Sequence, residues 1–133
     1  MSRSDYNGDG MDYRSLILWR GAVASAIRGK RGQALLQEML TALDAMPEKR
    51  LISSELQNEN GEHCALGVVA QCRSLDVSGI DPEDYEQVAK AFRVAPALIR
   101  EITFENDEAY PYDESPESRW THVRQWVKEN IKK

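Results

Sequence analysis

The sequence predicts a mainly α (α+β) fold: a compact six-helix single domain with a small β-hairpin between the second and third helices. In six stretches, apolar residues recur every three or four positions, which is typical of amphipathic helices. Glycine, proline and aspartate punctuate these stretches. The segment 64–72 has no charged residue in a chain that is 29% charged. We therefore expect a buried central helix, with helices from both ends of the chain packed around it.

The first two helices are expected at 12–28 and 32–46. Gly29 ends the first, as glycine does after a helix, and Pro47 stops the second. Because the link between them is short, we expect them to form an antiparallel helical hairpin.

The β-hairpin is expected from residues 51–56 and 62–64, with Asn60-Gly61 at its turn. The third helix then covers 65–75.

Three more helices follow. Asp81-Pro82-Glu83 and Ser115-Pro116-Glu117 combine a capping residue, a proline and an acid, which predicts helix starts at both places. A helix at 96–105 lies between the two that these signals open. The predicted core consists of Leu16, Trp19, Val23, Ile27, Leu36, Met39, Leu43, Leu66, Val69, Val88, Phe92, Ile99, Ile102, Trp120, Val123 and Val127.

A chain of 133 residues fits one domain. We assign 12–133 to it and 1–11, which are polar and glycine-rich, to a flexible N-terminal tail. The net charge of −5 is unevenly spread. Residues 1–35 carry six basic and three acidic groups, whereas residues 81–118 carry eleven acidic and three basic groups. Such polarity suits a charged partner.

The sequence contains no apolar run of the ~20 residues that cross a membrane, and its start lacks the apolar core of a signal peptide. We therefore expect a cytoplasmic protein without membrane contact, as a monomer or homodimer, whose two cysteines are reduced.

An acidic, aromatic loop follows the helix at 96–105. Its tyrosines offer rigid contact area, and its carboxylates suit a basic groove on another protein. The candidate binding residues of this acidic loop are Glu105, Asp107, Glu108, Tyr110, Tyr112, Asp113 and Glu114.

A second candidate surface is the basic corner of Arg28, Lys30 and Arg31. The Gly-Lys-Arg-Gly run at 29–32 joins two helices, as does the nucleic-acid clamp of KH domains, although the strand that a KH domain needs before it is missing. Residues 88–102 also match a degenerate helix-turn-helix. Arg93 replaces the usual turn glycine there, and Arg100 is the one basic residue that the second helix offers. Both features make nucleic-acid binding the alternative hypothesis.

Evidence for catalysis is thin. His63 and Cys64 are adjacent, so they point apart on a strand, and a cysteine nucleophile needs a base within hydrogen-bond reach. Asp5, Asn7 and Asp9 begin a calcium-loop pattern, but Leu16 stands where the bidentate glutamate belongs. We therefore expect no enzyme activity, cofactor or metal.

The segments Cys64-Ala65-Leu66-Gly67, Glu105-Asn106-Asp107 and Ser115-Pro116-Glu117, with Arg119 and Trp120, resemble small phage and prophage proteins to which no activity is assigned. The resemblance covers about 12–130 and implies a mobile-element accessory protein in a host bacterial cell. The leading hypothesis is thus a non-enzymatic protein that binds a host protein, including a host defence component.

Overall fold

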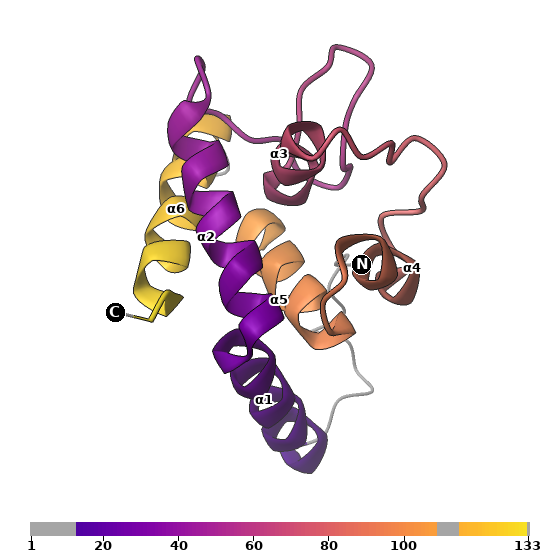
Figure 1. Ribbon diagram of the computed structural model, residues 1–133, viewed down its shortest axis with the longest axis vertical. Helices are drawn as coiled ribbons and strands as arrows, with labels where there is room; N and C mark the ends of the chain where they lie inside the picture. The colour runs from indigo at the N-terminus through magenta and orange to yellow at the C-terminus, as the bar shows by residue number, and fades with distance from the viewer. Residues whose placement is uncertain (1–12, 109–114, 133) are drawn as a thin grey trace.

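The computed structural model describes residues 13–108 and 115–132, except for the side chains of Tyr13 and Leu16. Within these residues the chain is helical and has no sheet, so the predicted mainly α fold is confirmed. The assigned tail, 1–11, lies outside the described residues. The helices are α1 (Tyr13–Arg28), α2 (Lys30–Ala45), α3 (Ala65–Cys72), α4 (Tyr85–Phe92), α5 (Pro96–Asp107) and α6 (Pro116–Asn130) (Figure 1).

Side-chain caps decide where two helices begin. Ser115 Oγ accepts a hydrogen bond (3.1 Å) from the backbone N–H three residues later, and a proline follows it, as the sequence predicts. The predicted start of the fourth helix at Asp81 is too early. Asp81 closes a short turn instead, and Asp84 caps α4 by accepting a hydrogen bond (3.2 Å) from the Gln87 N–H.

The predicted antiparallel hairpin of the first two helices is wrong. α1 projects beyond the start of α2, and the two helices follow each other with a bend (Figure 1). Gly29 is extended (φ −69°, ψ 162°), yet its N–H still bonds the Ser25 carbonyl, and its carbonyl accepts from the Gln33 N–H. One extended residue bends the chain without reversing it. At Gly32, a Cβ would lie 2.0 Å from the Ala26 carbonyl oxygen, so only glycine fits where the helices touch.

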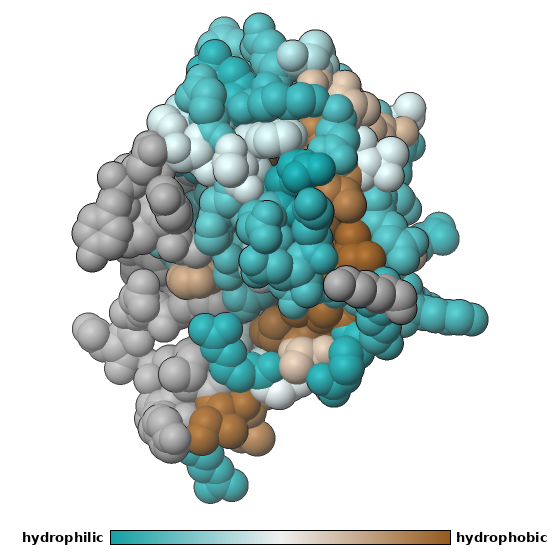
Figure 2. Space-filling model, turned by 90° about the vertical axis from the view of Figure 1, so that its left-hand side faces the viewer, coloured by the Kyte–Doolittle hydropathy of each residue, from teal (hydrophilic) through white to brown (hydrophobic). Residues whose placement is uncertain are grey.

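The projecting helix α1 buries one face and exposes another. Val23 is buried, whereas Ile17 and Leu18 are 52% and 66% exposed. Figure 2 shows an apolar area at the lower end of the molecule, which is the end that α1 occupies. α1 therefore packs on α5 and the start of α2 without being enclosed.

The predicted β-hairpin is also wrong. In the described residues, this segment makes one isolated antiparallel bridge, between Gln57 and His63. The expected turn does form: Gly61 has a φ of +77°, and the Asn58 side chain accepts the N–H groups of Asn60 (3.0 Å) and Glu62 (2.9 Å). The turn is thus present without strands to extend it.

Side chains of α5 and α6 bond the backbone at both ends of this segment. Asn106 Oδ1 accepts from the Ala65 N–H (3.1 Å), and its Nδ2 donates to the Ile52 carbonyl (2.9 Å). Arg119 Nη1 donates to the Leu51 carbonyl (2.9 Å). We call Asn106 and Arg119 the clamp residues. They satisfy the carbonyls of Leu51 and Ile52 and the N–H of Ala65, the first residue of α3.

The uncharged helix α3 is buried as predicted, with Leu66 1% and Val69 0% exposed. A Cβ on Gly67 would lie 1.9 Å from the Leu56 carbonyl oxygen, so this glycine lets the preceding loop cross α3 closely. However, α3 is not the centre of the packing. α5 contacts α1, α3, α4 and α6 and occupies the middle of the bundle (Figure 1). Its polar residues Glu101, Thr103 and Asn106 are buried. Because polar residues usually face solvent, the sequence of α5 resembles that of a half-exposed helix.

Most of the predicted core is confirmed. Trp19, Ile27 and Trp120 are half-buried, and the side chain of Leu16 lies outside what the structure describes. The predicted residues that are buried are Val23, Leu36, Met39, Leu43, Leu66, Val69, Val88, Phe92, Ile99, Ile102, Val123 and Val127.

No helix in the described residues has the length and apolar character to cross a membrane.

Candidate functional site

The basic corner lies on the surface at the junction of α1 and α2. Arg28, Lys30 and Arg31 are all exposed, and the first turn of α2 contains no acidic residue. The end of the chain adds a fourth basic residue, because Lys132 Nζ donates to the Arg28 carbonyl (2.7 Å). The positive end of the α2 dipole lies at the same place. The corner is therefore a local cationic surface on a protein with a net charge of −5.

The structure joins this corner to two arginines that are distant in the sequence. Arg31, Arg73 and Arg93 line one open groove of about 440 Å³, which we call the arginine groove. Arg73 follows α3, and Arg93 follows α4 in a left-handed conformation (φ 61°, ψ 41°). Apolar side chains, among them Leu75 and Phe92, line the same groove. Three helix ends thus bring cationic groups to one amphipathic surface.

Arg73 is fixed in position. Its Nε and Nη2 donate to both oxygens of Glu38 (2.7 and 3.0 Å), and its Nη1 donates to the Phe92 carbonyl (3.3 Å). Its guanidinium also lies 5.7 Å from the centre of the Phe92 ring. Among the described residues, by contrast, the side chains of Arg31 and Arg93 have no hydrogen-bond or ion-pair partner. Two guanidinium groups of the groove are therefore available to a ligand.

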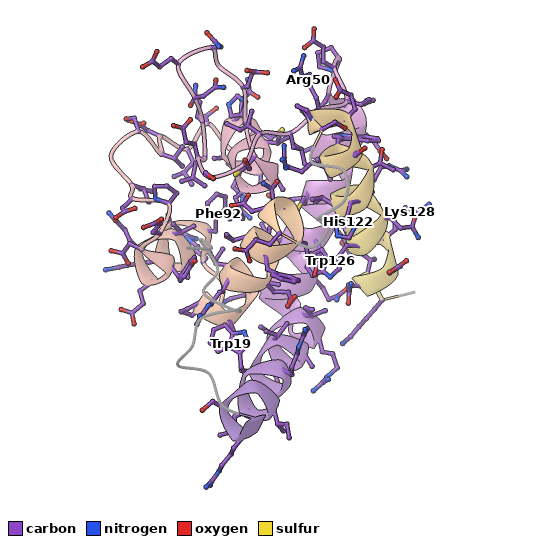
Figure 3. The ribbon with its side chains drawn as sticks, turned by 180° about the vertical axis from the view of Figure 1, so that it is seen from behind. Trp19, Arg50, Phe92, His122, Trp126 and Lys128 are labelled. Carbon is purple, nitrogen blue, oxygen red and sulfur yellow. The ribbon has the colours of Figure 1, made fainter. Side chains whose placement is uncertain are left out.

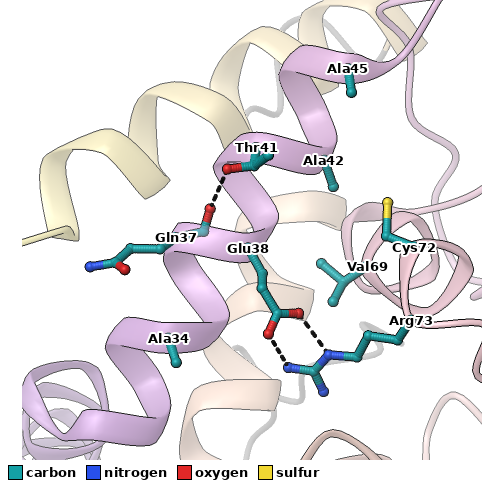
Figure 4. Close-up of a pocket in the computed structure, with 9 residues that line it drawn as sticks. All are labelled: Ala34, Gln37, Glu38, Thr41, Ala42, Ala45, Val69, Cys72 and Arg73. Carbon is teal, nitrogen blue, oxygen red and sulfur yellow. Dashed lines mark hydrogen bonds and ion pairs between the residues drawn. The ribbon is translucent and has the colours of Figure 1, made fainter.

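A second, larger groove runs between α2 and α3 (Figure 4). It has a volume of about 710 Å³, and its floor includes the buried Ala42 and Val69. Ala34 and Arg73 line both grooves, so the two grooves adjoin. Cys72 is an exposed, free thiol on the rim, whereas Cys64 is buried.

The described part of the predicted acidic loop is turned inward. Glu105 is only 11% exposed in its side chain, and its Oε1 lies 2.9 Å from His122 Nε2. Asp107 accepts a hydrogen bond from the Ser54 N–H (3.3 Å) and one from Asn106 Nδ2 (2.7 Å). Glu108 is half-buried. The other candidate residues, Tyr110, Tyr112, Asp113 and Glu114, lie outside the described residues.

Glu105 and His122 belong to a polar cluster that joins α1, α5 and α6. Burial raises the pKa of Glu105, while a hydrogen bond with Glu101 and the charge of Arg20 oppose the shift. Burial lowers the pKa of His122, because it disfavours the charged form of the imidazole. Arg20 forms an ion pair (3.7 Å) with Glu101, whose side chain is 3% exposed. Figure 3 places His122 and Trp126 between α5 and α6. The cluster satisfies buried charges between helices, and the sequence gives no sign of it.

Neither nucleic-acid motif gains support from its surroundings. α5, the second helix of the helix-turn-helix match, is enclosed by other helices, and the Arg100 guanidinium lies over the rings of Trp19 (4.7 Å) and Tyr85 (5.7 Å). In the Gly-Lys-Arg-Gly run, the close contact with Ala26 accounts for Gly32. These residues are engaged in packing.

The residues weighed for catalysis and metal binding are separated or buried. Cys64 is 0% exposed, and its neighbour His63 is half-buried, with a pKa that burial lowers. The calcium-loop pattern at Asp5, Asn7 and Asp9 lies outside the described residues. Across 13–108 and 115–132, no group of histidine, cysteine and acidic side chains is arranged to hold a metal ion.

The sequence interpretation did not place Arg73 and Arg93 beside Arg31. Arg93 stands in a region with eight more acidic than basic groups, so counting charges along the chain hides it. One signal was present: an arginine stands where the turn after α4 needs a left-handed residue, which few non-glycine residues adopt.

The comparisons with known proteins do not narrow the function. Neither a protein-family model, nor a curated protein, nor a solved structure matches the chain.

Proposed function

We propose that the protein is a small, non-enzymatic phage or prophage accessory protein that binds an acidic surface of a host protein. The arginine groove is the proposed contact surface. The observation that carries the proposal is the meeting of Arg31, Arg73 and Arg93, from three separate elements, in one open groove. Among the described residues Glu38 is the one acid paired with Arg73, so this cluster keeps a positive formal charge within an acidic protein.

The composition of the groove favours a protein partner. The half-buried Leu75 and Ala91 lie among the arginines, so a ligand would contact apolar and cationic groups together. Arginine is enriched at protein interfaces because its planar group binds carboxylates with two hydrogen bonds. A nucleic acid would approach mainly through phosphates, and the net charge of −5 would oppose that approach. The leading hypothesis is therefore retained, with the arginine groove, which shares Arg31 with the basic corner, in place of the acidic loop as its contact surface.

The test compares two charge-reversal variants of equal charge. Arg31→Glu with Arg93→Glu alters the groove, while Arg14→Glu with Lys128→Glu makes the same change in charge on α1 and α6. Lys128 is on α6, which does not line the groove (Figure 3). Each purified protein is immobilised and exposed to lysate of the bacterium that carries the gene, and the captured proteins are quantified by mass spectrometry.

We expect the wild type and the Arg14/Lys128 variant to capture the same acidic protein, and the Arg31/Arg93 variant to lose it at least tenfold. Equal capture by all three proteins would contradict the proposal. If the captured material disappears after nuclease treatment of the lysate, and its binding depends on Arg31 and Arg93 and falls steeply with salt, the nucleic-acid alternative is correct.

A further inference from the structure

The two grooves adjoin at Ala34 and Arg73, and we call them together the furrow. The chemistry of its lining differs between the two ends. At one end, Arg31, Arg73 and Arg93 supply positive charge. At the other end, the lining residues Thr41, Ala42, Ala45, Val69 and Cys72 carry no charge. Figure 4 shows the Glu38–Arg73 ion pair across the furrow, between α2 and α3. A ligand that fills the furrow must therefore be apolar at one end and acidic at the other.

The shape of the furrow follows one face of α2. Its lining residues on α2 recur at intervals of one or three positions from Ala34 to Ala45, and the eleven steps between these two residues span about 16 Å, or three turns. The alanines on this face keep the furrow open, and small side chains allow a second helix backbone to approach to the usual ~8–10 Å. The length suits a short helix lying along α2.

An extended peptide fits less well. Extended ligands gain affinity by hydrogen-bonding an exposed strand edge. The main walls of the furrow are the helices α2 and α3, whose backbone groups already bond within each helix. A helical ligand satisfies its own backbone and needs only side-chain contacts.

From this we infer that the furrow receives an amphipathic α-helix of the partner protein. The bound segment is about three turns long. Small or apolar residues on one face lie over the exposed side chains of Ala45 and Thr41, and carboxylates at one end bind Arg31 and Arg93. The inference rests on the proposed function and names the partner segment.

Cys72 provides a direct reporter. It lies on the rim of the furrow and is exposed, whereas Cys64 is 0% exposed, so alkylation of the folded protein reports on Cys72. Random 16-residue peptides displayed on a surface are selected against the wild-type protein. The enriched peptides are then synthesised, together with scrambled versions of the same composition, and tested for protection of Cys72 against iodoacetamide.

We expect enriched peptides to carry apolar residues at a spacing of three to four and acidic residues at one end. They should slow the alkylation of Cys72 at least tenfold, and the scrambled peptides should not. Thr41→Glu, which places a charge in the apolar part, should weaken these peptides about tenfold. Thr121→Glu is the matched control on α6, because Thr41 and Thr121 are both exposed and both donate to the carbonyl four residues earlier.

Three results would overturn the inference. The first is that no peptide is enriched. The second is that the enriched peptides leave Cys72 fully reactive or lack a helical spacing of apolar residues. The third is that Cys72 becomes protected without peptide as the protein concentration rises, which would assign the furrow to a second copy of the chain. In the second case, dependence on Arg31 and Arg93 would leave the proposed function standing. Conversely, peptides that protect Cys72 while lysate capture ignores Arg31→Glu with Arg93→Glu would refute the proposed function alone.

Discussion

The clamp and the arginine groove use polar side chains in opposite ways. At the clamp, the side chains of Asn106 and Arg119 form hydrogen bonds with backbone groups of residues 51–65. At the groove, Arg31 and Arg93 have no such partner among the described residues. A polar residue that satisfies buried backbone contributes to stability, while an exposed arginine without a partner contributes little. The comparison separates residues that maintain the fold from residues that are free to bind.

The largest effect is expected at the clamp. Asn106→Ala removes the hydrogen-bond partners of the buried Ala65 N–H and of the Ile52 carbonyl. Leaving such groups unsatisfied costs about 1–3 kcal/mol each, so the free energy of unfolding should fall by about 3 kcal/mol. Urea denaturation followed by circular dichroism measures it. Asn60→Ala, at an exposed position, is the control and should change stability by less than about 0.5 kcal/mol. A loss under about 1 kcal/mol at Asn106 would contradict the role assigned to the clamp.

A pair of glycines tests the packing beside the clamp. Gly67→Ala places a Cβ against the Leu56 carbonyl oxygen, so the backbone must shift, and we expect a loss of about 1–3 kcal/mol. Gly21→Ala is the control in another helix, where a Cβ meets nothing within 4 Å. It should stabilise the protein by about 0.5–1 kcal/mol, as alanine does in a helix. Similar effects at the two positions, measured by thermal unfolding, would show that α3 is not crossed closely.

These positions also show what the sequence can predict. Helices, their approximate limits and most of the core follow from the spacing of apolar residues, and the buried position of α3 follows from its lack of charge. The failed β-hairpin shows the limit. Leu51 and Leu56 are buried as a strand would bury them, but their segment is bonded by Asn106 and Arg119, which are 54 and 68 positions away from their partners in the chain. No local pattern encodes that contact.

The candidate site was predictable only in part, because some of its residues are neighbours in the sequence and others meet only in the fold. Arg28, Lys30 and Arg31 are contiguous, so the sequence identifies the basic corner. Arg73 and Arg93 join it only because α3 and α4 pack near the start of α2. The acidic residues Glu105 and Asp107 appear free in the sequence and are engaged in the fold.

A smaller, pH-dependent effect is expected at Glu105. Because burial raises its pKa, this carboxyl contributes most to stability below its unfolded value near 4.5, and the contribution is lost as the pH rises through the folded pKa. Glu105→Gln stays neutral, so its stability relative to the wild type should rise between pH 4 and pH 8. Asp76→Asn is a control of opposite sign, since hydrogen bonds from Ser78 lower the pKa of Asp76. Urea midpoints at a series of pH values measure both, and parallel curves would contradict the burial effect.

The smallest effect on stability is expected at the groove. Arg31→Glu with Arg93→Glu changes exposed side chains without partners in the described structure, so the free energy of unfolding should change by less than about 0.5 kcal/mol. Glu38→Ala breaks the ion pair with Arg73, whose side chain is 29% exposed, and should cost about 0–1 kcal/mol. A loss above about 2 kcal/mol in the double variant would move these arginines into the group that maintains the fold.

The most direct test of the central claim is the affinity of the captured host protein for three purified proteins, measured by calorimetry at one salt concentration. We predict that Arg31→Glu with Arg93→Glu weakens binding at least tenfold, while Arg14→Glu with Lys128→Glu stays within twofold of the wild type. Equal affinities for all three, or an equal loss in both variants, would contradict a binding site in the arginine groove.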